Sequence, residues 1–154
     1  MSKSKRNVVD PEHILTTYGA DTARLFMLSD SPPERDLEWT EAGIEGAFRF
    51  MQKIWKLAMN TDASGRDFNP EEAKLTDQDE ILLRALHTAI QSIENDFERF
   101  AFNTCVAHLH VLVNAISNYT GDQQENRTMR SYALRHLAVL LSPFSPHIAE
   151  EIWQ

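Results

Sequence analysis

The sequence has 154 residues, of which 42% are hydrophobic, and a formal net charge of −8 at pH 7. A chain of this size and hydrophobic content can bury the core of one ordinary domain, which excludes a disordered protein. The negative charge excludes a protein that coats nucleic acid indiscriminately, although it permits a local cationic surface. A single cysteine, Cys105, excludes an internal disulfide and is typical of the cytoplasm. No apolar run approaches the roughly 20 residues that span a bilayer, so we expect no membrane partner.

The chain opens with MSKSKRN, which places three cationic and two hydroxyl side chains within six residues. Ammonium groups neutralise the charge of a polyphosphate, and hydroxyls and loop amides donate hydrogen bonds to it. Basic N-terminal segments are also common as plain tails. From its own residues, the segment is therefore either a basic tail or a phosphate-binding loop.

Two short helices are predicted after this opening. Asp10 and Pro11 form a helix-start signal and Gly19 a stop, which predicts a helix over 12–18. Residues 21–28 predict a second short helix. The polar, proline-rich stretch 30–36 then predicts a loop. We place a domain boundary there, which divides the chain into residues 1–38 and 39–154.

The second part has the periodicity of long amphipathic helices. Thr40 is expected to cap a helix that runs to about Asn60, with a buried stripe of Ile44, Phe48, Met51, Trp55 and Ala58. Thr76 is expected to cap the next helix, with an apolar face of Leu82, Leu86, Ala89, Ile93, Phe97 and Phe100. Further helices are expected over 103–119, about 126–141 and 147–154. Four long helices with short connections favour an all-α antiparallel helical bundle. The last apolar stripe stops within a helix, from which we expect a truncated chain.

The sequence offers little for metal or nucleophilic chemistry. His108 and His110 are two positions apart, so on a helix they point to nearly opposite sides and cannot share a metal ion. Cys105 lies in an apolar helix and is interpreted as a core residue rather than a nucleophile. Neither of the common glycine-rich phosphate loops is present. We predict no metal site and no self-contained nucleotide-binding fold.

A cationic strip is predicted on the helix that begins after Thr40. Arg49, Lys53 and Lys56 recur at i, i+4 and i+7, opposite the expected apolar stripe. Such a strip can hold a phosphate backbone electrostatically. It can equally be a solvated helix face, and the spacing alone does not decide between the two.

Three stretches together resemble the class I aminoacyl-tRNA synthetases. The opening MSKSKRNVVDP, with YGADTARLFML after it, is similar to their Lys-Met-Ser-Lys-Ser signature loop and the segment that follows. SPPERDLEWTEAGIEGAFRF at 31–50 resembles the bacterial leucyl branch. LSPFSPHIAEEIW at 141–153 is similar to the end of the helical anticodon-binding domain. The resemblance covers essentially the whole chain.

This resemblance implies that Met1, Ser2, Lys3 and Ser4 contribute an ATP-binding loop. Lys3 matches the second lysine of the signature, which in the family stabilises the developing pyrophosphate charge during leucine activation, and is the expected catalytic residue. The implied partners are tRNA(Leu), leucine and ATP with Mg, and not DNA. Arg49, Lys53 and Lys56 are expected to contact the tRNA backbone. The family's nucleotide-binding half and leucine pocket have no counterpart in these residues, so the 154 residues alone are expected to be inactive.

Two alternatives remain from the residues themselves. One is the equivalent segment of an isoleucyl-, valyl- or methionyl-tRNA synthetase, and the other is a free-standing helical interaction module. Arg6, where those relatives usually carry glycine, and the DLEW stretch at 36–39 favour the leucyl branch.

Overall fold

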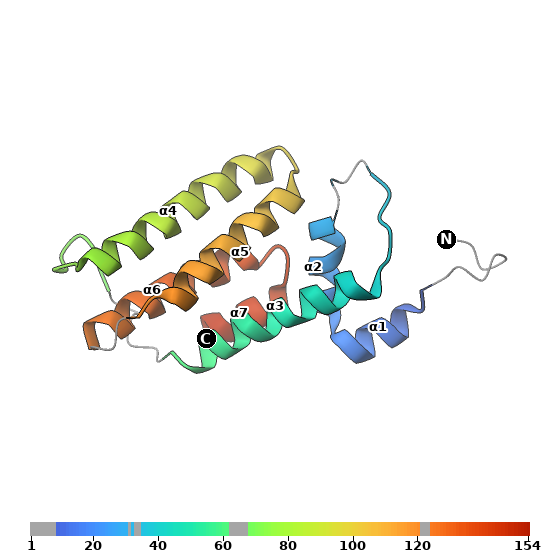
Figure 1. Cartoon of the computed structure of the whole chain (residues 1–154), viewed down its shortest axis with the longest axis horizontal. Helices are drawn as coiled ribbons and strands as arrows, with labels where there is room; N and C mark the ends of the chain where they lie inside the picture. Colours follow the sequence, from blue (N-terminus) through green and yellow to red (C-terminus); the bar gives the residue numbers. More distant parts are fainter. Residues whose placement is uncertain (1–8, 31, 33–34, 62–67, 121–123) are drawn as a thin grey trace.

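The computed structural model describes residues 9–30, 32, 35–61, 68–120 and 124–154, with only the backbone described for 124–127. In this part of the chain every regular element is a helix (Figure 1). The helices are α1 (Pro11–Tyr18), α2 (Ala20–Asp30), α3 (Glu41–Met59), α4 (Asp77–Glu98), α5 (Phe102–Asn118), α6 (Gln124–Leu141) and α7 (Pro146–Trp153). The predicted all-α fold is confirmed, and the predicted helices are each found within about two residues of their expected ends, as is usual for helix boundaries.

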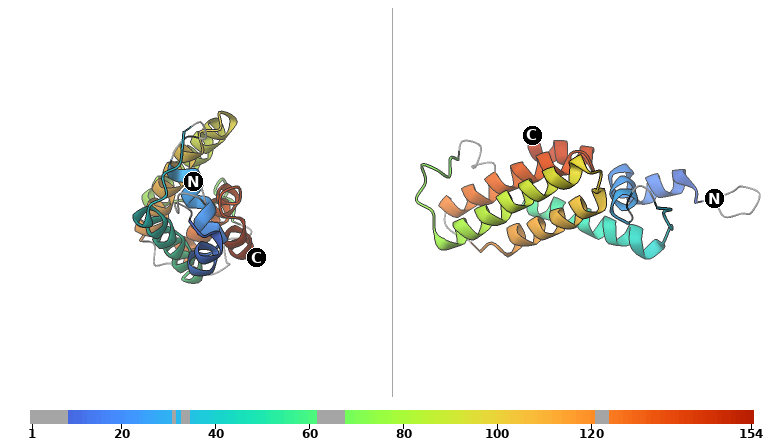
Figure 2. Two further views of the ribbon diagram at one scale, coloured as in Figure 1. Left: turned by 90° about the vertical axis from the view of Figure 1, so that its right-hand side faces the viewer. Right: turned by 90° about the horizontal axis from the view of Figure 1, so that it is seen from above.

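The helices form an elongated bundle with α1 and α2 at one end (Figures 1 and 2). α4 packs along α5, both pack on α6, and α6 packs on α7. α2 joins this bundle through contacts with α3 and α5. A single hydrophobic core runs from Leu25 and Phe26 of α2 to Leu141 of α6. The first segment of the chain is therefore packed into the same core as the long helices.

Two helix starts follow the caps that the sequence predicts. The Thr40 hydroxyl accepts a hydrogen bond from the backbone N–H of Gly43 at 3.2 Å. At α4, Thr76 and Asp79 form a reciprocal capping box, in which the Asp79 carboxylate accepts from the backbone N–H of Thr76 at 2.8 Å. Such pairs satisfy backbone donors that the first helical turn leaves without partners.

The predicted buried stripe of α3 is partly wrong. Trp55 is 41% exposed, and Phe48 and Ala58 are only half-buried. The residues that α3 buries are Ile44, Ala47, Phe50, Met51 and Ile54. This face is the buried one because α3 packs on α2 and α7, while the Phe50 ring stacks on His110 of α5 at 3.6 Å between centroids. Both faces have helical spacing, so periodicity alone did not distinguish them.

The predicted apolar face of α4 is correct to Ile93 and wrong beyond it. Phe97 is 41% exposed and Phe100 is 64% exposed. The helix ends at Glu98, and Phe100 has a left-handed backbone with φ of 57° where the chain reverses into α5. Phe102 takes the inner position instead, with its ring centroid 5.4 Å from that of Phe97.

The two glycines of α3 give a matched stability prediction. A Cβ at Gly43 would overlap the Phe26 ring and lie 2.8 Å from the Thr40 hydroxyl, whereas a Cβ at Gly46 would meet only Arg49, at 3.9 Å. We expect Gly46→Ala to stabilise the fold by about 0.5–1 kcal/mol, because alanine is the better helix former. Gly43→Ala is expected to destabilise it by about 1–3 kcal/mol through overpacking. Urea unfolding of both variants checks this, and equal effects would contradict the described α2–α3 contact.

Candidate functional site

The expected ATP-loop residues Met1, Ser2, Lys3 and Ser4 lie outside the described residues. The first described element after them is α1, which Asp10 caps by accepting a hydrogen bond from the Glu12 N–H at 3.1 Å. α1 ends at Gly19, whose φ of 84° belongs to the left-handed region that glycine adopts without strain. The chain passes directly from this turn into α2.

A set of polar contacts, here called the α2–α7 clamp, ties the start of α2 to the start of α7. The Asp21 carboxylate accepts from the backbone N–H of Ile148 at 2.7 Å and lies 2.8 Å from Nδ1 of His147. The Ser145 hydroxyl donates to the Asp21 carbonyl at 3.3 Å. Arg24 donates to the carbonyl of Pro143 at 3.0 Å. Sequence patterns did not predict this clamp, although both of its ends lie in stretches that resemble a known family.

An open groove of about 690 Å³ lies beside this clamp, where the α1–α2 turn, α3 and the start of α7 meet. Its aromatic lining comes from Tyr18, Phe48 and Trp55. Tyr18 and Phe48 meet edge to face, with ring centroids 5.7 Å apart. Gln52 and His147 supply polar groups at the same groove.

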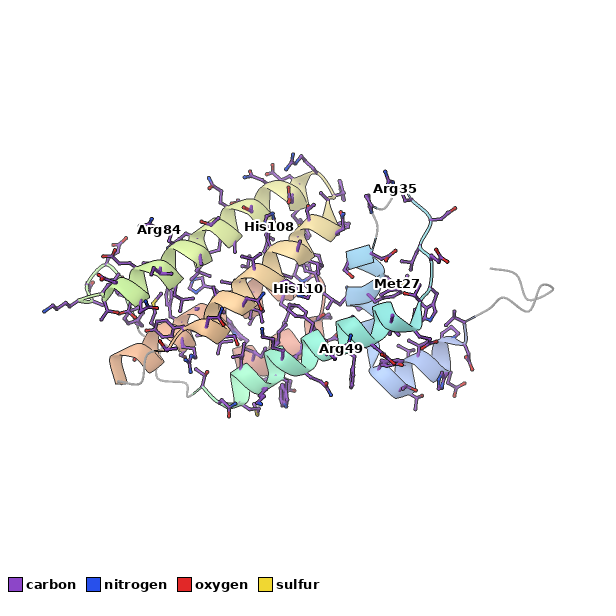
Figure 3. The ribbon with its side chains drawn as sticks, viewed as in Figure 1. Met27, Arg35, Arg49, Arg84, His108 and His110 are labelled. Atoms are coloured by element: carbon purple, nitrogen blue, oxygen red, sulfur yellow. The ribbon has the colours of Figure 1, made fainter. Side chains whose placement is uncertain are left out.

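The three predicted cations of α3 do not behave alike. Arg49 is exposed and lies 3.6 Å from Glu45 in the same helix, an arrangement that contributes little to stability. Lys56 is also exposed. Lys53 is half-buried and donates to Oδ1 of Asn114 on α5 at 2.7 Å. Figure 3 shows Arg49 on α3 and His110 on the neighbouring α5. The strip is therefore two accessible cations and one that also joins α3 to α5.

His110 is a packing residue in this arrangement. The residue is exposed, but its ring stacks on Phe50, and the resulting partial desolvation, with the nearby charge of Lys53, lowers the pKa of its imidazole. Both effects disfavour the charged imidazolium form of His110.

A second polar network fastens α4, α5 and α6. The Tyr119 hydroxyl donates to the buried Asp79 carboxylate, and Arg130 donates to the carbonyl of Tyr119. Burial raises the pKa of Asp79, but the hydrogen bonds from Tyr119 and Thr76 outweigh it and leave that pKa below its ordinary value. Burial and the same carboxylate raise the pKa of Tyr119. This network is structural, since its members bond to one another.

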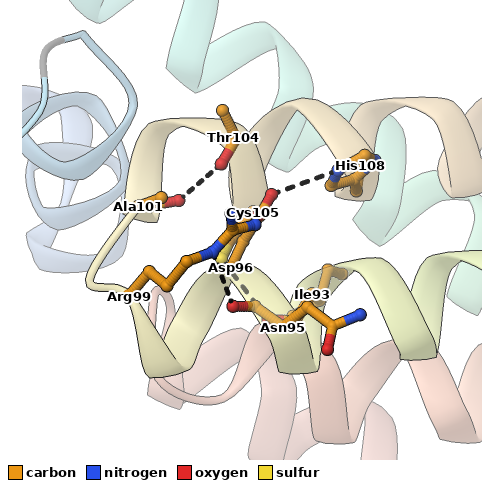
Figure 4. Close-up of polar contacts among 8 residues, drawn as sticks. All are labelled: Ile93, Asn95, Asp96, Arg99, Ala101, Thr104, Cys105 and His108. Atoms are coloured by element: carbon orange, nitrogen blue, oxygen red, sulfur yellow. Dashed lines mark hydrogen bonds and ion pairs between the residues drawn. The ribbon is translucent and has the colours of Figure 1, made fainter.

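A further titratable cluster lies at the α4–α5 turn (Figure 4). The Asp96 carboxylate pairs with Arg99 and lies 3.3 Å from Nε2 of His108. Cys105 is fully buried with its thiol 3.7 Å from the Ile93 carbonyl, and burial raises the pKa of that thiol. A buried protonated thiol is a poor nucleophile, so Cys105 is a core residue, as predicted.

Two kinds of feature are absent from the part of the chain that the structure describes. No group of three or more His, Cys, Asp and Glu side chains there is placed to hold a metal ion. None of the helices among the same described residues combines the length and apolar character that crossing a membrane requires.

Comparison with known families matches both parts of the chain. Residues 79–154 match the anticodon-binding domain of tRNA ligase. Residues 1–40 match the class I tRNA synthetases of the I, L, M and V group. The clamp therefore joins a segment of the synthetase family to the anticodon-binding type of helical domain. These matches, on an all-helical bundle, define a class I tRNA synthetase segment.

Individual relatives narrow this class further. The chain is 44% identical to a leucine–tRNA ligase of Prochlorococcus marinus over 99% of its own length and 17% of the relative's. It is 45% identical to that of Parvibaculum lavamentivorans over 100% of its length and 18% of the relative's. The chain belongs to the leucine–tRNA ligase family. It spans about a sixth of the length of these relatives.

Solved structures agree with this assignment. The ternary complex of LeuRS, tRNA and LeuAMS from Agrobacterium radiobacter K84 superposes with a TM-score of 0.88 and 29% identity, over 99% of this chain and 20% of that one. A methionyl-tRNA synthetase of Mycobacterium tuberculosis reaches a TM-score of 0.78 at 21% identity, over 99% of this chain and 34% of that one, which reflects a shared fold. The predicted leucyl branch is confirmed over its methionyl alternative.

Proposed function

We propose that this chain is part of an enzyme that activates leucine with ATP and joins it to tRNA(Leu) in the cytoplasm. The observation that supports this proposal is the similarity, across the whole chain, to proteins named leucine–tRNA ligase. Residues 1–38 would carry the ATP loop and its connecting segment. Residues 39–154 would dock the tRNA.

Within this proposal, Lys3 contacts ATP and stabilises charge on its leaving pyrophosphate, beside Met1, Ser2 and Ser4. The Mg ion that accompanies ATP would neutralise further phosphate charge. Arg49 and Lys56 are exposed and can reach tRNA phosphates. Lys53 is partly engaged with Asn114, so we assign it the smaller share of the tRNA contact.

Binding of tRNA(Leu) to the 154-residue chain tests the docking role. We expect the double variant Arg49→Gln/Lys56→Gln to bind more weakly. The plot of log affinity against log salt concentration has a negative slope, and its magnitude should decrease by about 2. This is close to one unit for each phosphate that a cation no longer neutralises. Lys74→Gln removes one positive charge from an exposed position outside α3 and is the control. Arg49→Gln and Lys56→Gln are also measured singly. If each weakens tRNA binding no more than Lys74→Gln does, a specific tRNA contact at α3 is contradicted.

A further inference from the structure

Trp55 is a large aromatic side chain of α3 that the fold leaves partly exposed. It is 41% exposed and lines the open groove with Tyr18 and Phe48. An indole is normally buried or hydrogen-bonded, because its large apolar face gains free energy when it leaves water. The neighbouring elements leave this face accessible even though a well-formed core lies on the adjoining face of the same helix.

The groove and the accessible cations are neighbours on α3, so the prediction that these cations lie opposite Phe48 and Trp55 is wrong. Since an α-helix turns about 100° per residue, Gln52 lies between the aromatic pair Phe48/Trp55 and the cationic pair Arg49/Lys56. A ligand in the groove would therefore have aromatic rings beneath it and, along one rim, Lys56 and Arg49, the latter also 3.6 Å from the Glu45 carboxylate. The Asp21 carboxylate at the groove already accepts hydrogen bonds from α7, which reduces its repulsion of an anion.

We propose that this groove binds a single unstacked nucleotide of an RNA strand, whose base or ribose packs on Trp55 while its flanking phosphates contact Arg49 and Lys56. This inference rests on the proposed function and adds a subsite to it. Aromatic faces accept any base, and adjacent cations hold the strand. The Gln52 amide and the exposed His147 ring lie at the groove and can hydrogen-bond to a base edge or a 2′-hydroxyl. An apolar protein segment would leave the cationic rim unmatched, so RNA is the favoured occupant.

The chain contains three tryptophans, which allows Trp55 to report on the groove directly. In a Trp39→Phe/Trp153→Phe variant, Trp55 is the sole source of indole emission. We expect a tRNA(Leu) transcript to quench this emission and to protect the indole from acrylamide. A control titration with inorganic phosphate should leave the emission unchanged, because phosphate alone offers nothing to stack.

Affinity measurements on tryptophan variants complete the test. Trp55→Ala is expected to weaken tRNA(Leu) binding about tenfold, within the range of base–aromatic stacking, without changing the salt slope. Trp55→Phe should lose less, because it keeps an aromatic face. Trp153→Ala is the matched control, since Trp153 is similarly exposed, at 46%, but lies outside the groove. The guanidinium carbon of Arg135 lies 4.6 Å from the centre of the Trp153 ring. Circular dichroism verifies that each variant is folded.

The outcomes separate this inference from the proposed function. If Trp55→Ala binds normally while Arg49→Gln/Lys56→Gln binds weakly, the nucleotide subsite is wrong and tRNA docking stands. If the unmodified chain binds no tRNA(Leu), the docking role and the subsite both fail. Emission of Trp55 that changes with protein concentration in the absence of RNA would assign the groove to a second copy of the chain and overturn the proposal. If Trp55→Ala does not fold, an absence of quenching in the single-tryptophan variant overturns it equally.

Discussion

Asp79→Ala is expected to destabilise the fold by about 3 kcal/mol at neutral pH, because it removes a helix cap and the buried acceptor of the Tyr119 hydroxyl. The carboxylate is buried, accepts from Tyr119 with one oxygen, and accepts from Thr76 with the other. Removing it leaves the Tyr119 hydroxyl without this acceptor among buried side chains. Urea unfolding followed by circular dichroism measures the loss.

Asp79→Asn adds a pH signature to this prediction. The hydrogen bonds from Tyr119 and Thr76 hold the pKa of Asp79 below its ordinary value despite the opposing effect of burial. A carboxyl with a lowered folded pKa contributes stability above its unfolded value of about 3.9 and loses that contribution as the pH falls through the folded pKa. The stability difference between the unmodified chain and Asp79→Asn should therefore be constant above about pH 5 and shrink below about pH 4.

Asp77→Asn is the control for Asp79. Asp77 lies in the same first turn of α4 but is exposed, so only its interaction with the helix dipole is lost, at a cost below about 1 kcal/mol. If both variants cost the same, the capping box and the bond from Tyr119 would have no special role.

Asp21→Ala is the second large prediction, with an expected cost of about 2 kcal/mol. The carboxylate caps a helix that lies far from it in sequence, so its loss should free the start of α7 from α2. Hydrogen exchange should then show faster exchange at the amide of Ile148, which donates to Asp21 at 2.7 Å. The amides of α4 and α5 should keep their protection, since α7 makes its main contacts with α6.

Asp10→Ala is the matched control for Asp21. Asp10 caps its own helix, α1, from an exposed position, and its loss should cost no more than about 1 kcal/mol. Exchange at Ile148 should remain unchanged in this variant. Faster exchange at Ile148 in both variants would mean that the clamp is not the cause.

Much of the fold follows from local signals in the sequence. The caps Thr40 and Thr76 depend on side chains within three residues of the amides they bind, so pattern alone located them. The helices expected over 103–119 and about 126–141 are found as α5 and α6, because each carries apolar residues at helical spacing that the core buries. The stripe of α3 is partly wrong because the positions of α2 and α7 decide which of two apolar faces is covered. Phe100 was misplaced because nothing local marks the reversal after Glu98.

The candidate groove was harder to predict than the helices. The spacing of Arg49 and Lys56 predicts that they share one face of α3. The same spacing predicts a buried Trp55, because helical periodicity does not distinguish an apolar residue in the core from one on an exposed face. The Asp21 clamp depends on a contact across 127 positions, which periodicity does not report. The two ends of the clamp share one sequence signal, which is that both lie in stretches that resemble the synthetase family.

The clamp also sets an order of events during synthesis of the protein. Asp21 leaves the ribosome long before Ile148, and at about 5–20 residues per second roughly ten seconds separate them. The helices of 77–141 can assemble on one another in this interval. The hydrogen bond from Ile148 reaches the start of α2 only after α7 has emerged, so it completes a helix whose packing on α3 and α5 can form earlier.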